Sequence, residues 1–462
     1  MGRSRFTITQ PEQNHIKTIL EQWALCVPTR ERGNEIIRER LMSRGVKVDT
    51  NVKVSGSIPC LWAEGKVSDV IKALESGVSV NGEDRKRLSS EKGVLKVSAV
   101  SYGYFDEFAQ KVISVEGELA RAKTHPKIGQ VIISRSNTEE LVGASAYIDK
   151  NYDYLFLPDK LWQTIPYPKS NMKWLSYVLA SDKSRYTLSK LATGTSGSMK
   201  NITKGELLGL KVLIPPPPEQ KKIAKILSTW DRAIEITEKL LNNSQQQKKS
   251  LMQQLLPGKK RLPGFGGEWQ SAPVKKMGKI VSGGTPATKV AKYWEGDVLW
   301  MTPTDVTALK NRFINNTKRK ITQSGVKNSS ATLIPKGSLL VCTRATIGLM
   351  SISTTEITTN QGFKNIVPDE NHDVNFLYYL FNFFKNKLIA HACGSTFLEL
   401  SKKDFERLSF VCPSMEEQQA ISSILSTADK EVETLQQKLA HLKQEKKALM
   451  QQLLTGKRRV VL

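Results

Sequence analysis

The chain contains 462 residues, 39% of them hydrophobic, and carries 69 lysines and arginines against 44 acidic residues, for a formal net charge of +25. The length predicts roughly three domains, and the hydrophobic content is ample for packed cores. The positive charge indicates a polyanionic partner, nucleic acid in the first place and a membrane surface in the second; basicity that serves only solubility is the alternative.

The cysteines, histidines and apolar runs further limit which class of protein this can be. The five cysteines form no CxxC pair, which fits a reducing compartment and argues against a disulfide framework or a zinc ribbon. The histidines show no metal-ligand spacing, and no apolar run approaches the roughly 18 residues of a membrane span. The first ten residues do not resemble a signal peptide. We therefore expect a soluble cytoplasmic protein.

The chain begins with a partial copy of a motif that occurs later in full. Residues 11–23 share the pattern P-E-Q-x-x-I-x-x-I-L-x-x-W with residues 218–230. Pro28 and Gly33 interrupt any longer helix. We interpret residues 1–45 as an N-terminal helical segment, a degenerate copy of the helical region described below; a chance match in an ordinary amphipathic helix is the alternative.

Two β-rich segments of similar layout follow, at residues 46–214 and 263–412. Short apolar runs alternate with glycine and serine turns in both. Matching stretches occur in the same order, although their spacing drifts: Trp62 and Trp269, 75–77 and 281–283, 93–96 and 297–300, 129–135 and 337–344, and helical segments from Met172 and near residue 375. Each half of the chain is therefore predicted to contain a variant of one β-rich globule.

Each globule is followed by a copy of one helical region, at residues 215–262 and 413–462. Residues 215–261 recur without a gap as residues 413–459, at a shift of 198 residues. Such self-similarity indicates repeated architecture. An S-x-x-D pattern at 228–231 and 426–429 resembles a capping box, so we expect a short helix to end near Leu227 or Leu425 and a long helix to begin there.

The long helices show heptad patterning typical of a coiled coil. The predicted seam positions are Leu227, Trp230, Ile234, Thr237, Leu241, Ser244, Lys248, Leu251 and Leu255 in the first copy, and Leu425, Ala428, Val432, Leu435, Leu439, Leu442, Lys446, Leu449 and Leu453 in the second. Two-fold repetition predicts that the copies pair antiparallel with each other; packing of each helix on its own globule is the alternative. Both copies end in a basic segment, at 258–261 and 456–459, which would complement the helix end or contact phosphate.

No catalytic signature is present. We find no G-x-x-x-x-G-K-[ST], no G-x-G-x-x-G after a strand, no H-E-x-x-H, and no amino-methyltransferase tetrad. Pro158-Asp159 and Pro368-Asp369 lack a suitably placed E-x-K for a nuclease. The residues therefore predict a non-catalytic nucleic-acid binder with two recognition globules. The alternatives are an enzyme with fused recognition domains and a basic coiled-coil adaptor that binds nucleic acid, or a membrane, without sequence preference.

The repeated motif, P-x-x-x-E-Q-x-x-I-x-x-I-L-S-T-x-D followed by L-M-Q-Q-L-L-x-G-K, resembles the helical regions of type I restriction–modification specificity subunits. Stretches such as 283–286, 302–305, 344–348 and 359–363 resemble one type of target recognition domain, and 93–101 with 134–143 resemble another. The resemblance implies an α+β fold, with two recognition domains separated by two long antiparallel helices in a pseudo-two-fold repeat.

The same resemblance implies a function in phage defence. Each domain would read one half of a bipartite DNA site, and the helices would set the spacer and dock two methyltransferase (modification) subunits. S-adenosylmethionine would be bound by those partners, and ATP with Mg²⁺ by restriction (translocase/nuclease) subunits. The chain itself would hold no cofactor, metal or catalytic residue.

Candidate DNA contacts follow from the chemistry of base edges. Arginine can bridge guanine, asparagine and glutamine can bridge adenine, and aspartate can accept from cytosine. The candidates are Ser101, Tyr102, Arg135, Ser136, Asn137 and Thr138 in the first globule, and Thr285, Thr304, Asp305, Arg344, Thr346, Asn360 and Gln361 in the second, with Ser395 and Thr396 as phosphate contacts. The alternatives are that Asn137 caps a turn, that Asp305 orders a loop, and that Arg344 pairs with a carboxylate.

Overall fold

A computed structural model describes residues 61–196, 199–309, 311–393 and 398–460. The predicted partial copy at residues 1–45 lies outside them. The chain divides into two compact units. The first combines the described residues up to Ile236 with those from Leu439 onward, and the second runs Thr237–Lys438. Both boundaries fall inside the long helices, so each unit contains part of each helix.

The globule of the first unit is built on two small sheets with the strand orders β2-β11-β7-β9 and β10-β3-β6. The first sheet is antiparallel throughout, whereas β10 pairs parallel to β3. The strands are β2 (Ile71–Ser76), β3 (Gly93–Leu95), β6 (Gln110–Val112), β7 (Val131–Ser134), β9 (Ser145–Tyr147), β10 (Leu155–Phe156) and β11 (Leu161–Pro166).

The second globule repeats this topology. Its main sheet has the order β16-β23-β20-β21-β18, and a smaller sheet has the order β19-β17-β22, in which β22 again pairs parallel to β17. The strands are β16 (Gly278–Ser282), β17 (Trp294–Met301), β18 (Phe313–Ile314), β19 (Arg319–Ile321), β20 (Leu339–Cys342), β21 (Met350–Ser353), β22 (Thr358–Thr359) and β23 (Phe363–Pro368). The predicted internal repeat is therefore confirmed at the level of strand order.

Helices and further short strands complete the globules. In the first they are β4 (Val100–Ser101), β5 (Tyr104–Phe105), α3 (Glu116–Arg121), β8 (Ser136–Asn137), α4 (Met172–Ala180), α5 (Asp182–Leu191), β12 (Thr193–Ser196), β13 (Met199–Asn201) and α6 (Lys204–Leu208). In the second they are α8 (Pro303–Ala308), α9 (Gln323–Lys327), α10 (Val374–Phe383), α11 (Lys385–Ala390) and α12 (Lys402–Arg407). A two-stranded ribbon closes each globule: β1 (Ala63–Lys66) with β14 (Lys211–Ile214), and β15 (Gln270–Pro273) with β24 (Ser409–Cys412).

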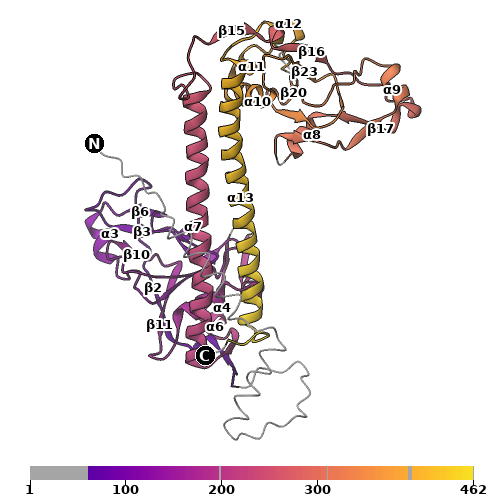
Figure 1. The fold of residues 1–462 in the computed structure, drawn as a ribbon. Coiled ribbons are helices and arrows are strands. Elements are labelled where there is room, and N and C mark those ends of the chain that lie inside the picture. Colours follow the sequence, from indigo (N-terminus) through magenta and orange to yellow (C-terminus); the bar gives the residue numbers. More distant parts are fainter. Residues whose placement is uncertain (1–60, 197–198, 310, 394–397, 461–462) are drawn as a thin grey trace, which may run out of the picture. The chain divides into compact units, whose positions relative to one another are not determined.

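The long helices are α7 (Pro217–Leu255) and α13 (Met415–Leu453), each 39 residues long and unbroken (Figure 1). The predicted break near Leu227 and Leu425 is therefore wrong. The Ser228 hydroxyl donates to the Ala224 carbonyl at 2.7 Å, one helical turn back, and so continues the helix instead of capping a new one. Ser426 repeats this bond in α13.

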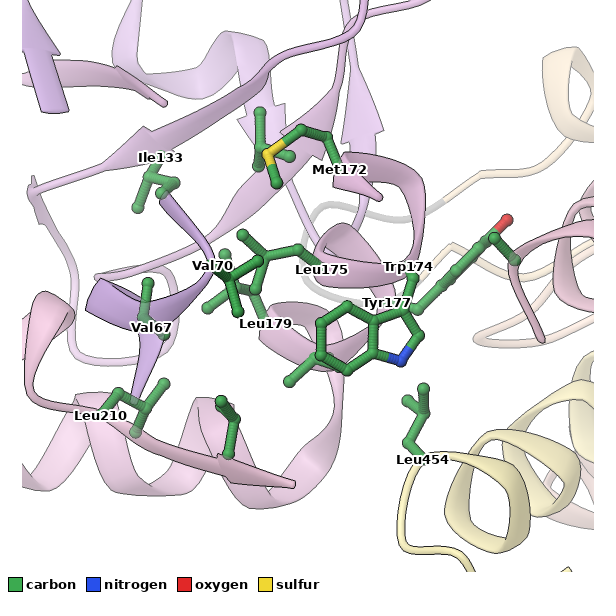
Figure 2. Close-up of a cluster of buried hydrophobic side chains, with 14 of the residues drawn as sticks. Val67, Val70, Ile133, Met172, Trp174, Leu175, Tyr177, Leu179, Leu210 and Leu454 are labelled. Carbon is green, nitrogen blue, oxygen red and sulfur yellow. The ribbon is translucent and has the colours of Figure 1, made fainter. Parts of the chain in front are cut away.

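The heptad seam is confirmed, because within each unit the beginning of one long helix packs against the end of the other. In the first unit, Leu227 and Trp230 of α7 share one core with Leu442, Leu449 and Leu453 of α13. In the second, Leu255 of α7 shares a core with Ile421 and Leu425 of α13. The pairing is antiparallel in each unit. In the first unit, the core continues from the helix pair into the globule through α4 (Figure 2).

The seam lysines are each neutralised by an aspartate from the opposite helix. Lys446 pairs with Asp231 at 2.5 Å in the first unit, and Lys248 pairs with Asp429 in the second. Each aspartate also accepts a hydrogen bond from a globule tyrosine: Tyr177 of α4 donates to Asp231, and its counterpart on α10 donates to Asp429. Burial raises the pKa of Tyr177, so the phenol stays protonated and able to donate.

A buried glutamate in the first turn of each long helix anchors the ribbon strands to the helix pair. Glu219, with 2% of its side chain exposed, accepts from Trp62 Nε1 at 2.9 Å and from Arg459 Nε at 2.8 Å. Glu417 repeats the arrangement with Trp269 Nε1 at 3.2 Å and Arg261 Nε at 2.8 Å. The last arginine of each basic segment therefore pairs with a buried carboxylate. The sequence suggests that these segments complement the helix end or contact phosphate, and neither interpretation includes this pairing.

One difference between the repeats leaves a hollow in the second unit. This pocket, of about 290 Å³, lies between the helix segments of the second unit and is lined by Ser244, Leu251, Ala428 and Glu431 among others. The residue 198 positions before Ala428 is Trp230, which is buried in the first unit. In the first unit the Trp230 indole packs in one core with Leu442 and Leu449, which lie 198 positions after the pocket residues Ser244 and Leu251.

Removing the buried carboxylate of the first unit should loosen that unit. We expect Glu219→Ala to lower the free energy of unfolding by about 1–3 kcal/mol, because Arg459 and the Trp62 indole both lose their acceptor. Chemical denaturation of the full chain measures the change. Glu64→Ala, which removes an exposed carboxylate from β1, is the control and should shift the midpoint little; equal effects of the two variants would contradict the anchoring role.

Candidate nucleic-acid interface

In the first unit, two of the predicted residues lie at the tip of a hairpin formed by β4 and β5. Ser101 pairs with Tyr104 across the hairpin, and the intervening Tyr102 and Gly103 have φ values of 42° and 89°. Left-handed backbone at both central positions is typical of a tight hairpin turn. The Tyr102 side chain is 65% exposed. The turn therefore presents an aromatic ring to solvent.

The other predicted residues of this unit follow β7. Arg135 donates to the Asp159 carbonyl at 2.8 Å and to its carboxylate at 3.2 Å. Ser136 is buried, with 3% exposed, so its side chain does not reach the surface. Asn137 accepts from the Thr138 backbone N–H at 2.9 Å, and its amide donates to the Ser134 hydroxyl at 3.4 Å. Thr138 is exposed and accepts two backbone bonds that begin the next turn.

Arg185 of α5 connects these two groups of residues. Its guanidinium donates to the Val142 carbonyl at 2.6 Å and to the Glu140 carbonyl, and it lies 5.8 Å from the Tyr102 ring centroid. Burial lowers the pKa of Arg185, but an arginine remains charged. The hairpin turn and the loop after Thr138 are therefore held beside one positive charge that sequence reasoning did not select.

In the second unit, the structure brings three predicted stretches together. Thr285 donates to the Gln361 side chain, and Gly284 N–H donates to the Thr359 carbonyl at 2.9 Å. A Cβ on Gly283 would lie 1.8 Å from the Asn360 carbonyl oxygen, so only glycine permits this approach. Asn360 N–H in turn donates to the Met301 carbonyl at 2.9 Å. Residues 283–285, 301–305 and 359–363 thus form one surface region.

The acidic candidate of this region has a structural role. Asp305 accepts from Thr302 N–H at 2.8 Å and from the Thr302 hydroxyl at 2.6 Å, which closes the first turn of α8. Its other oxygen accepts from Lys318 N–H at 2.8 Å. Both carboxylate oxygens are therefore engaged in ordering the loop. Thr304, one residue earlier, is exposed and available.

Arg344 and its neighbours form the rim of a hollow in the same region. A pocket of about 310 Å³ is lined by Pro303, Arg344, Ala345, Asn360, Gln361 and Gly362. The Arg344 guanidinium lies 3.6 Å from the Glu399 carboxylate, in a largely exposed ion pair. Such pairs are weak, so the guanidinium can exchange this partner for another acceptor. Thr346 lies 3.2 Å from the Cys342 sulfur and supports the turn.

The backbone at this rim is strained, and a buried cation lies beside it. Ala345 has a φ of 62°, in the left-handed region that an alanine rarely adopts, and such outliers concentrate at functional sites. Burial lowers the pKa of Lys364, whose ammonium approaches the Gln361 carbonyl at 3.5 Å. Ser395 and Thr396 lie outside the described residues. The hollow thus combines amide and guanidinium groups, which suit the edges and phosphates of nucleic acid, and the Lys364 ammonium lies buried near its Gln361 side.

An arginine and two tryptophans next to this region were not selected from the sequence. Trp294 and Trp300 of β17 meet edge to face with centroids 5.0 Å apart, and Arg319 of β19 stacks on Trp294 at 3.8 Å. Trp300 Nε1 donates to the Gly284 carbonyl at 2.9 Å. The only sequence signal is the basic triplet at 318–320, because cross-strand pairing of Arg319 with Trp300 is a tertiary feature.

The described residues offer neither a candidate metal centre nor a candidate membrane-spanning helix. No group of three histidine, cysteine or acidic residues among residues 61–460, apart from the gaps given above, could hold a metal ion. Among the helices that the structure describes, none combines the length and apolar character that crossing a membrane requires. The candidate residues with exposed side chains include Tyr102 and Thr138 in the first unit and Thr304 and Arg344 in the second.

Comparison with known proteins identifies the family. The family described as "Type I restriction modification DNA specificity domain" matches residues 59–244 and 266–444. The MjaIX type I restriction enzyme specificity subunit of Methanocaldococcus jannaschii is 38% identical over 171 residues, which are 36% of this chain and 39% of that relative. The MjaX specificity subunit of the same organism is 25% identical over 425 residues, 88% of this chain and 95% of the relative.

A solved structure supports the fold. The crystal structure of the S subunit of a type I restriction-modification system from M. genitalium matches with a TM-score of 0.57 at 14% identity, covering 87% of this chain and 98% of the other. At that identity the likeness concerns the fold alone. Since the family match covers more than half of its 462 residues, this chain belongs to the type I restriction–modification DNA specificity family.

Proposed function

We propose that this chain is the DNA-recognition subunit of a type I restriction–modification complex, with residues 46–214 and 263–412 as its two target recognition domains. Each domain reads one half of a bipartite DNA site. The regions 215–262 and 413–462 fix the gap between the halves and dock two modification subunits. The observation that carries this proposal is the repetition of one architecture with unlike surface residues in its two copies.

The repeated and the variable parts support different roles. The helix-anchoring contacts recur almost unchanged, with Glu219 and Glu417 each holding one tryptophan and one arginine. The candidate recognition surfaces differ: a tyrosine hairpin in the first unit, and a hollow rimmed by Arg344 and Gln361 in the second. Like partners need like docking faces, whereas two different half-sites need different readers.

The chemistry of modification and cleavage would belong to other subunits. S-adenosylmethionine would be bound by the modification subunits, and ATP and Mg²⁺ by restriction subunits. This chain would be non-catalytic and would work in the cytoplasm, where the chromosome and incoming DNA meet the complex. Its net charge of +25 would supply the phosphate contacts that make binding strong and salt-dependent.

The complex should methylate a two-part motif. We expect co-expression with the modification subunit, followed by genome-wide mapping of methylated adenines, to yield two short specific blocks separated by a gap of fixed length. The modification subunit alone is the control and should give no such motif. A continuous motif would contradict the two-reader arrangement, and binding to DNA without sequence preference would favour the adaptor alternative.

Arg344 should contribute to the reading of one base pair. We expect Arg344→Ala to weaken specific binding by about 1–3 kcal/mol and to relax discrimination at one position, since arginine can bridge guanine through two hydrogen bonds. Competition binding with singly substituted duplexes measures both effects. Arg407→Ala, which removes an exposed arginine of α12, should leave the profile unchanged. Equal weakening on every duplex would instead identify Arg344 as a phosphate contact.

A further inference from the structure

The guanidinium of Arg319 is mounted on a rigid aromatic platform. It lies 3.8 Å from the ring centroid of Trp294 and 5.3 Å from that of Trp300. The two indoles are only 7% and 4% exposed. Each is fixed by its own hydrogen bond, Trp294 Nε1 to the Ala287 carbonyl at 3.2 Å and Trp300 Nε1 to the Gly284 carbonyl at 2.9 Å. The platform therefore cannot turn with the arginine.

The N–H groups of Arg319 are free to meet a ligand. The residue is exposed, and the hydrogen bonds and ion pairs among the described residues include none from its guanidinium. Asp305, which accepts from the backbone of the neighbouring Lys318, is also held by Thr302. Stacking occupies a face of a guanidinium and leaves its in-plane donors open, so the donors point away from the rings.

Position in the fold connects Arg319 with the candidate interface. It lies directly opposite Trp300 on the paired strand, so both side chains stand on the same face of the small sheet. Trp300 contacts Gly284, whose neighbour Thr285 binds Gln361. Two lysines flank the arginine at 318 and 320. The residue thus stands beside the predicted DNA-reading stretches on a positively charged strand.

We propose that Arg319 is a specificity-determining residue of the second unit, whose stacked guanidinium donates two parallel hydrogen bonds to O6 and N7 of one guanine. This inference rests on the proposed function and adds a reader to it. A flexible arginine loses conformational entropy when it binds a base edge, and the Trp294–Trp300 platform reduces that loss because it holds the guanidinium plane in advance. Phosphates also accept the arginine fork, but the place of Arg319 beside the predicted reading stretches, through Trp300 and Gly284, favours a base edge.

The test uses the complete complex with its modification subunit and a set of duplexes in which each base pair of the mapped site is changed singly. We expect Arg319→Gln to slow methylation of the native site by about 10- to 100-fold and to abolish discrimination at one G·C pair, in one half of the site only. Arg319→Lys, which keeps the charge but lacks the fork, should not restore either property. Lys318→Gln removes the same charge one residue away and should leave discrimination intact.

Several outcomes would overturn the inference. Equal loss on all duplexes, with recovery in Arg319→Lys, would assign Arg319 to a phosphate. An unchanged profile in Arg319→Gln would show that the arginine only covers the tryptophans. Tryptophan fluorescence and the thermal midpoint identify any variant that fails to fold. If Arg319→Gln fails to fold, the discrimination profile of Arg319→Lys decides between a base contact and a phosphate contact. A wild-type complex that methylates no bipartite site would refute the proposed function itself, whereas a normal wild type with unaffected variants would refute this inference alone.

Discussion

A carboxylate buried near the start of each long helix is the constraint on which the rest of the structure depends. Glu219 and Glu417 each bind an indole and a guanidinium that come from distant parts of the chain. A buried charge is costly unless it is fully paired, so helix start, ribbon strand and basic segment must all be in place together. About three turns further along each helix, an aspartate that contacts a globule tyrosine and a lysine of the opposite helix holds the same elements together.

Most of the fold could be predicted because repetition leaves a strong signal in the sequence. The heptad pattern of the helical regions predicted the seam, and the order of matching stretches predicted two variants of one β-rich globule. The helix boundary failed for a physical reason. Ser228 and Asp231 have the spacing of a cap, but the serine bonds back to Ala224 and the aspartate serves Tyr177 and Lys446. The local sequence permits either a helix cap at Ser228 or a continuous helix, and the tertiary partners of Asp231 favour the continuous helix.

The candidate interface was predictable in outline but not in its roles. Motif residues in the second unit do come together, since Gly283 and Asn360 approach too closely for any other residue at the glycine position. Which of them face outward depends on cross-strand packing. Asp305 turned inward to its loop, and Ser136 is buried. Arg185 and Arg319 acquire their settings from partners far along the chain, so no local pattern marks them.

The composition of the two units has a consequence for synthesis on the ribosome. The second unit is one continuous stretch, Thr237–Lys438, whereas the first also requires residues beyond Leu439. When Lys438 is made, the second unit has all of its residues, but the first still lacks Leu442, Leu449 and Arg459, which complete its core and its buried carboxylate. Chains usually fold from the N-terminal domain onward. Here the half that is begun first closes after the other half, because residues made later than the whole second unit complete its core.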